Sequence, residues 1–372
     1  MSFFSELKRR NVFKVGIAYA IVAWVLVQIV IAVKAPLHLP EWVDTLIIVL
    51  LAVGFPIVMI ITWAFELTPE GVRKTGGKDQ QESALPEQEK ISSGDSRRGE
   101  IRFCTTADDI RLAYSVYGSG YPVVKTGNFI SHQELEWGNT LLWPMIRDLS
   151  ARYSVISYDG RGTGLSDRDV SEFSLDTMVE DMETVIDANK LEKFSVVAYS
   201  QSCMVAITYA VRHPERVANL VLFGGFVRNF RQQEEIEAMA SLFAQNWDQA
   251  NPATRQIFTT SLVPDGSKEE SEAFNELQRN CASPENISRL FRTIHGFDVR
   301  ELAKQVSVPT LVMHSRDEPG VPLECGREMA SLIPGARFIA LESRNHILLE
   351  REPAYQRFLE ETFNFIEGNK PT

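Results

Sequence analysis

Two apolar stretches without a charged side chain lie within the first 70 residues of this 372-residue chain. Residues 15–33 and 45–65 are each long enough, at about 1.5 Å per helical residue, to cross the roughly 30 Å apolar core of a bilayer. The short connection between them contains Pro36 and Pro40, which suits a helical hairpin. Residues 1–70 are therefore predicted to form a membrane hairpin with two transmembrane helices. The alternative is a cleaved signal peptide, but its apolar region is shorter and no second stretch follows it.

Basic residues gather on the outer flanks of the two stretches, and the connection between them holds only Lys34. The flanks contain Lys8, Arg9, Arg10, Lys14, Arg73, Lys74 and Lys78. Positively charged flanks of membrane helices stay on the cytoplasmic side. The lipid bilayer is thus an expected partner, and the large C-terminal part is expected in the cytoplasm.

The strings FSELKRRNVF (residues 4–13) and FELTPEG (residues 65–71) carry a resemblance of their own. They resemble a two-span N-terminal module of bacterial membrane proteins, which is fused there to varied cytoplasmic domains. The resemblance covers roughly residues 3–74, and it implies an inner-membrane location but no chemistry. Residues 71–99 are rich in Gly, Gln, Glu, Ser and Lys and can bury little apolar surface, so they are predicted to form a flexible linker.

From residue 100 to about residue 370, short apolar runs alternate with helical patterns. The predicted strands are residues 110–116, 122–126, 153–158, 194–199, 217–223, 310–314 and 337–341. The predicted helices include residues 175–188, 202–212, 323–332 and 355–367. Continuous apolar strands that alternate with helices predict an α/β fold with a mostly parallel sheet, covered by helices on both faces.

Residues 227–306 interrupt this alternation with a helical pattern that contains no strand, and they are predicted to form an insertion over one edge of the sheet. The segment is rich in aromatic residues, namely Phe230, Phe243, Trp247, Phe258, Phe274 and Phe291. These side chains either form the insertion's own core, or a few of them line an apolar substrate pocket.

Charge and cysteine spacing exclude several classes of function. The net charge of -11 would repel a phosphate backbone, so nucleic-acid binding is not expected. The four cysteines are scattered without a C-x-x-C pair, and the histidines show no metal-ligand spacing. Neither a metal nor another cofactor is predicted.

One serine stands where a predicted strand runs directly into a predicted helix. Ser200 follows residues 194–199 and precedes the helix of residues 202–212. A turn this tight leaves room only for small residues two places before and two places after the serine. Ala198 and Ser202 occupy these places, where glycine is usual, so Ser200 is the candidate nucleophile and Ser202 is the nearest rival hydroxyl.

Three further strings lie in the order that a serine triad on such a sheet requires. The string DGRGTGLS (residues 159–166) follows an apolar strand and lacks the spacing of a phosphate-binding loop. Two acids, Asp317 and Glu318, follow the strand of residues 310–314. His346 follows the strand of residues 337–341.

Together these strings resemble an α/β-hydrolase with a helical cap, over about residues 100–368. The resemblance implies that Ser200 is the nucleophile and His346 the general base. The acid lies four residues after the histidine of the family's H-G-x-x-D string, which is Glu318 when counted from His314. Asp317 is the alternative acid.

The oxyanion hole of the family is built from two main-chain N–H groups. One belongs to the residue after the nucleophile, here Gln201. The other follows the second strand, where the family has H-G-x and this chain has Thr126-Gly127-Asn128. Asn128 is therefore the second candidate donor.

The expected function is that of a membrane-anchored serine hydrolase that cleaves small carboxylic esters with an apolar acyl group. Thioesterase, amidase, lactonase and perhydrolase activities on the same fold are alternatives, because a fold does not determine a reaction. A catalytically inactive sensor that binds a ligand or partner at the membrane is the remaining alternative.

Overall fold

The computed structural model describes residues 100–371, the strands β1 (Phe65–Thr68) and β2 (Gly71–Lys74), and six helical residues between residues 42 and 55. The chain divides into two compact units, Met1–Lys90 and Ile91–Thr372. The predicted span 15–33, and most of 45–65, lie outside the described residues. None of the helices in the described part has the length and apolar character needed to cross a bilayer. Strand β2 pairs antiparallel with β1 at the position where the predicted linker begins.

The second unit is built on an eight-stranded sheet with the order β10-β9-β8-β7-β5-β6-β4-β3. The strands are β3 (Ile101–Thr105), β4 (Arg111–Tyr117), β5 (Pro122–Lys125), β6 (Ser154–Tyr158), β7 (Phe194–Tyr199), β8 (Val217–Phe223), β9 (Thr310–Ser315) and β10 (Arg337–Leu341). Strands β5 to β10 pair in parallel, and β3 and β4 form an antiparallel edge. The mostly parallel α/β sheet predicted from the sequence is confirmed.

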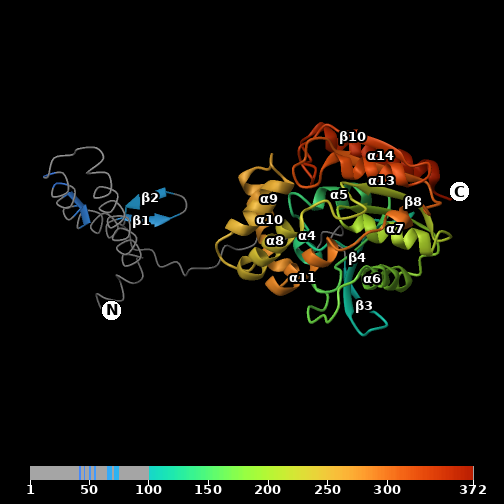
Figure 1. Cartoon of the computed structure of the whole chain (residues 1–372), viewed down its shortest axis with the longest axis horizontal. Helices are drawn as coiled ribbons and strands as arrows, with labels where there is room; N and C mark the ends of the chain where they lie inside the picture. Colours follow the sequence, from blue (N-terminus) through green and yellow to red (C-terminus); the bar gives the residue numbers. More distant parts are fainter. Residues whose placement is uncertain are drawn as a thin grey trace. The chain divides into compact units, whose positions relative to one another are not determined.

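Helices cover both faces of this sheet (Figure 1). They are α4 (Gln133–Glu136), α5 (Trp143–Ser150), α6 (Leu175–Ala188), α7 (Ser202–Arg212), α13 (Leu323–Leu332) and α14 (Pro353–Asn369). Side chains of α6, α7 and α13 pack into one apolar core with one face of the sheet. Side chains of α5 and α14 pack into a second core on the other face. Strands β7, β8 and β9 are buried at almost every position, as expected for strands covered on both faces.

The carboxyl ends of the central strands lie at one level because of the register of the sheet. Tyr199 at the end of β7 pairs with Phe223 at the end of β8. Leu341 at the end of β10 pairs with Ser315 at the end of β9. The loops that follow these strands therefore meet at one edge, which is where ligands bind in open α/β sheets.

The segment between β8 and β9 forms the helical cap. It contains α8 (Gln233–Asn246), α9 (Ala253–Leu262), α10 (Lys268–Cys281), α11 (Pro284–Ile294) and α12 (Arg300–Ala303). Helices α8 to α11 lie together beside the sheet (Figure 1). Phe243 and Trp247 are fully buried in a core formed chiefly by the cap, so these two aromatics form the insertion's own core.

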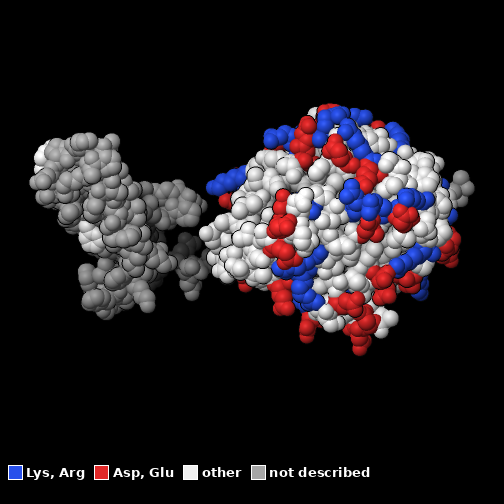
Figure 2. All heavy atoms as spheres, in the orientation of Figure 1, with Lys and Arg blue, Asp and Glu red and all other residues white. Residues whose placement is uncertain are grey.

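Acidic and basic side chains are interspersed over the face of this unit that Figure 2 shows. The unit also contains ion pairs near its surface, such as Arg228 with Glu328 and Arg292 with Glu237. That face has no broad basic area of the kind that binds nucleic acid.

Candidate active site

Ser200 occupies the sharp turn between β7 and α7. Its φ is +58°, a left-handed value that non-glycine residues seldom adopt and that is often found at functional sites. The Ser200 N–H donates to the Phe223 carbonyl oxygen at 2.9 Å, which ties the turn to the end of β8. The strained strand-to-helix turn expected around the candidate nucleophile is therefore present.

The small residues around Ser200 have distinct environments. Ala198 is fully buried in the core. The Ser202 hydroxyl donates to the Tyr199 carbonyl oxygen at 2.8 Å and accepts a hydrogen bond from the Thr126 hydroxyl at 2.6 Å. Ser202 therefore closes the turn with its side chain, whereas Ser200 lines the cavities described below.

Glu318 and His346 meet at the carboxyl edge of the sheet, after β9 and β10. The Nδ1 atom of His346 forms a hydrogen bond with the Glu318 carboxylate, and the Glu318 side chain is fully buried. The other ring nitrogen, Nε2, is buried and has no hydrogen-bond partner within residues 100–371. Asp317 is exposed, and its main-chain N–H donates to the Ser343 carbonyl oxygen at 3.1 Å. Of the two candidate acids, Glu318 is the one that contacts the histidine.

His314, from which the position of the acid was counted, also contacts Glu318. Its Nε2 lies 3.0 Å from Glu318 Oε1 and 3.0 Å from the Val321 carbonyl oxygen. Burial raises the pKa of Glu318, but the charge and hydrogen bonds of the two histidines outweigh burial and hold that pKa below its usual value. The string His314-Ser-Arg-Asp-Glu318 carried a signal for this contact, because its first and last residues are spaced like those of H-G-x-x-D.

Two close contacts hold His346 in place. Its main-chain N–H donates to the carbonyl oxygen of Leu262 at 2.7 Å, so the last turn of α9 in the cap supports the histidine loop. On the other side, Gly224 follows β8 with a φ of +58°. A Cβ atom at Gly224 would lie 2.9 Å from His346 Cε1, so this close approach requires glycine.

The two candidate oxyanion donors lie next to Ser200. Asn128 and Gln201 are both buried, and both line a cavity beside the Ser200 turn. The Asn128 side chain donates to the Tyr199 carbonyl oxygen at 3.3 Å, which fixes its loop against the end of β7. In the part of the chain that the structure describes, neither main-chain N–H donates a hydrogen bond to a protein group. Both remain available to an oxyanion.

Ser200 lies between two cavities under the cap. The first has a volume of about 40 Å³ and is lined by His346 and by a wall of apolar side chains, among them Ile130, Leu142, Phe258 and Phe274. The second has a similar volume and is lined by aromatic and polar side chains, among them Phe230, Phe291, Arg231 and His295. Phe230, Phe258, Phe274 and Phe291 line these cavities, and Phe258, Phe274 and Phe291 also belong to the core of the cap.

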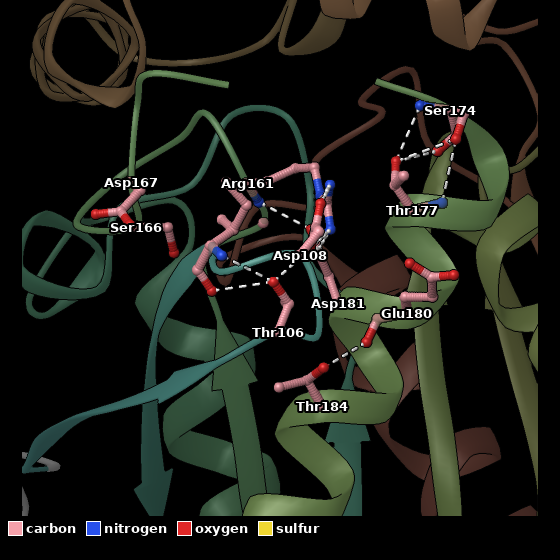
Figure 3. A network of polar contacts seen from close by, with 12 residues as sticks. Thr106, Asp108, Arg161, Ser166, Asp167, Ser174, Thr177, Glu180, Asp181 and Thr184 are labelled. Atoms are coloured by element: carbon pink, nitrogen blue, oxygen red, sulfur yellow. Dashed lines mark hydrogen bonds and ion pairs between the residues drawn. The ribbon is translucent and has the colours of Figure 1, made fainter. Parts of the chain in front are cut away.

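The DGRGTGLS loop is held in place by buried polar contacts. Arg161 is almost fully buried between Asp108 and Asp181, as Figure 3 shows. Its Nη1 donates to Asp108 at 2.7 Å, and its Nη2 donates to Asp181 at 2.8 Å. The Asp159 carboxylate accepts the Leu165 N–H at 2.9 Å and approaches Gly164 so closely that no other residue fits there. The loop's charged groups are thus used within the protein, which gives the loop a structural role.

The family that this fold and site define is the α/β-hydrolases. A model of the family described as alpha/beta hydrolase fold matches residues 137–353, which is more than half of the chain. The chain therefore belongs to the α/β-hydrolase family. The matched region includes Ser200, Glu318 and His346.

Known relatives support the same assignment. The chain is 26% identical over 244 residues to RutD of Azorhizobium caulinodans, which is named as a carbamate hydrolase, and this match covers 64% of the chain and 89% of RutD. Two solved esterases share the fold. The first, from Exiguobacterium antarcticum, has a TM-score of 0.63 and 22% identity, with 72% of this chain and 100% of the other covered. The second, RhEst1 from Rhodococcus sp. ECU1013, has a TM-score of 0.62 and 24% identity, with 72% and 99% covered.

Proposed function

We propose that this protein is a serine hydrolase that cleaves carboxylic esters with an apolar acyl group. The observation that carries the proposal is the buried Glu318–His346 pair. The Nε2 atom of His346 has no hydrogen-bond partner among residues 100–371, and His346 lines the same cavity as Ser200. A histidine held by a carboxylate on one nitrogen and free on the other is arranged as a general base.

The reaction proceeds through an acyl-enzyme. Ser200 Oγ attacks the ester carbonyl carbon while His346 Nε2 takes its proton. Glu318 stabilises the resulting imidazolium, and the N–H groups of Asn128 and Gln201 stabilise the oxyanion, each with about 3 kcal/mol. The imidazolium then returns the proton to the leaving alcohol. Water deacylates Ser200 by the same steps, again with His346 as the base.

The apolar cavity beside Ser200 favours an apolar part of the substrate without charge. Its wall of Ile130, Leu142, Phe258 and Phe274 offers a chain no hydrogen-bonding side chain. Burial of each CH₂ group is worth about 0.8 kcal/mol, so chain length will affect binding. Thioester, amide, lactone, carbamate and perhydrolase chemistry use the same groups, and they remain alternatives to the ester.

The experiment combines an active-site probe with an ester series on the purified full chain. A fluorophosphonate is expected to label the wild-type protein, and p-nitrophenyl esters of increasing acyl length are expected to be hydrolysed. Ser200→Ala should abolish both, by a factor of about 10⁶ in turnover. Ser202→Ala is the matched control and should keep labelling. No labelling of the folded wild-type protein would favour the inactive ligand-binding or partner-binding alternative.

We also propose that the hydrolase is anchored in the inner membrane and faces the cytoplasm. Support comes from the uncharged stretches 15–33 and 45–65 and from the basic residues on their outer flanks. Among the described residues of the first unit, Trp42 and Leu50 are 62% and 61% exposed, as expected of side chains that contact lipid.

A further inference from the structure

Arg231 brings a positive charge into the second cavity beside Ser200. Among the described residues that line this cavity, Arg231 is the one with a charged side chain. Its neighbours there include the aromatic side chains Phe226, Phe230 and Phe291. Charge interactions in a partly enclosed apolar site are stronger than at an exposed surface.

The Arg231 guanidinium has unused hydrogen-bonding capacity. Its Nη2 donates to the Gly320 carbonyl oxygen at 2.8 Å. Its Nε is buried and has no partner, and no carboxylate in residues 100–371 lies within ion-pair distance of it. Glu235, an acid whose charge influences the pKa of Arg231, is exposed. Burial lowers the pKa of Arg231, but an arginine remains charged at neutral pH. Arg231 as a whole is half-buried, and a partly buried cation without an anion loses hydration that a bound anion would replace.

His295, the other titratable side chain in this cavity, cannot bind an anion. Its Nδ1 lies 2.8 Å from the Phe291 carbonyl oxygen, which must accept a hydrogen bond, so Nδ1 carries the proton. Burial lowers the pKa of His295 to about 4, and the ring is neutral at pH 7. The Nε2 lone pair of this tautomer cannot donate to a carboxylate, so Arg231 is the donor that the cavity offers.

We propose that the ester substrate carries a free carboxylate, which Arg231 binds in the second cavity while the apolar part of the substrate occupies the first. This inference rests on the proposed function, because it assigns a substrate class to the same site. The substrate class is a monoester of a dicarboxylic acid or an ester of a hydroxy acid. Arginine suits this role because its planar fork binds a carboxylate through two hydrogen bonds.

The test compares esters of matched length on the purified full chain. Monoethyl adipate and ethyl hexanoate have the same six-carbon acyl chain, with and without a terminal carboxylate. Acetylated 4-hydroxybutyrate and butyl acetate form the equivalent pair on the alcohol side. The wild-type protein is expected to prefer the anionic member of at least one pair by about 10- to 100-fold in kcat/KM, the value of one or two charged hydrogen bonds.

Variants then assign the preference to Arg231. Arg231→Met should remove it through a higher KM for the anionic ester, with kcat/KM for the neutral ester changed less than about threefold. Arg231→Lys, which keeps the charge without the fork, should keep part of it. Arg228→Met is the matched control, because Arg228 precedes Arg231 by three residues but pairs with Glu328 at the surface. It should behave as wild type.

Three outcomes would overturn the proposal. The first is a wild-type protein without preference in either pair. The second is an Arg231→Met variant that loses activity equally on neutral and anionic esters, since Arg231 would then only hold the Gly320 loop beside Glu318. The third is an unchanged preference for the anionic ester in Arg231→Lys and Arg231→Gln. These two variants replace Arg231→Met if thermal unfolding shows that the methionine variant does not fold.

A binding measurement tests this inference separately from the proposed function. Calorimetry on Ser200→Ala measures the affinity for monoethyl adipate without requiring catalysis. Tighter binding of monoethyl adipate than of ethyl hexanoate, lost in Ser200→Ala/Arg231→Met, supports the carboxylate site even if the fluorophosphonate fails to label the protein. Equal affinity for the two esters rejects the site even if Ser200 is the nucleophile.

Discussion

Two consecutive acids, Asp317 and Glu318, have opposite environments although they differ by one CH₂ group. Glu318 is buried against His346 and His314, whereas Asp317 points to solvent. The spacing of the string favoured Glu318 and left Asp317 as the alternative acid. The direction of each side chain on the loop after β9 decides between them.

The loss of the buried acid should therefore be far more costly than the loss of its neighbour. Glu318→Gln is expected to lower turnover of a p-nitrophenyl ester by about 10⁴-fold, because the amide cannot stabilise the imidazolium. Asp317→Asn removes an exposed charge and should keep at least about a tenth of normal activity. The reverse ranking would move the acid to Asp317, and full activity in the double variant would remove it from this loop.

His295 predicts a pH dependence of stability. Burial lowers its pKa from 6.5 to about 4 in the folded protein, so the unfolded chain binds a proton more readily between these values. The folded state therefore loses stability as the pH falls from about 6.5 to about 4, by up to about 3 kcal/mol. His295→Asn can still donate to Phe291 and does not titrate. Its free energy of unfolding in urea should fall less than that of the wild type between pH 7 and pH 4.5. Equal pH slopes for the two proteins would contradict this assignment.

At the scale of elements, the turn after β8 couples the sheet to the general base. Gly224 has a positive φ and lies against the His346 ring, whereas Gly335 has a positive φ of +70° with no neighbouring atom within 4 Å of an added Cβ. A comparison of the two glycines therefore separates the effect of backbone strain from the effect of contact with His346.

Gly224→Ala and Gly335→Ala should both lose about 1–2 kcal/mol of stability, because alanine disfavours a positive φ. Only Gly224→Ala adds a Cβ atom that displaces His346. A displacement of a reacting group by about 1 Å costs about 10²-fold in kcat/KM. Ester hydrolysis and thermal unfolding of both variants provide the measurements. Equal activity in the two variants would show that the His346 ring tolerates the added methyl group.

At the scale of the whole molecule, the proposed membrane hairpin determines where the hydrolase works. The basic residues that flank the hairpin predict that the C-terminus remains in the cytoplasm. Alkaline phosphatase fused after Thr372 should therefore be inactive, since this reporter needs an oxidising compartment, whereas a fusion in the connection after Lys34 should be active. High activity of an intact C-terminal fusion would reverse the proposed orientation.

Most strands and helices of the second unit could be predicted, because apolar periodicity is a local property. Strand β7, strand β8 and helix α6 have the predicted bounds. Strand β3 was not predicted, since it lies at the sheet edge with an exposed, irregular pattern. Helix α5 was not among the helices named from the sequence, and it is only 8 residues long.

By itself, the sequence determined the fold class, the order of the strings around Ser200, Glu318 and His346, and the candidate residues of the oxyanion hole. Those inferences depend on residues that are close along the chain. Only the tertiary structure decided which acid faces His346, that His314 contacts the same carboxylate, and that Arg231 reaches the cavity of Ser200. Arg231 and Gly320 are 89 residues apart, and His346 and Glu318 are 28 apart. Contacts across such separations arise from sheet order and cap packing, which local patterns do not encode.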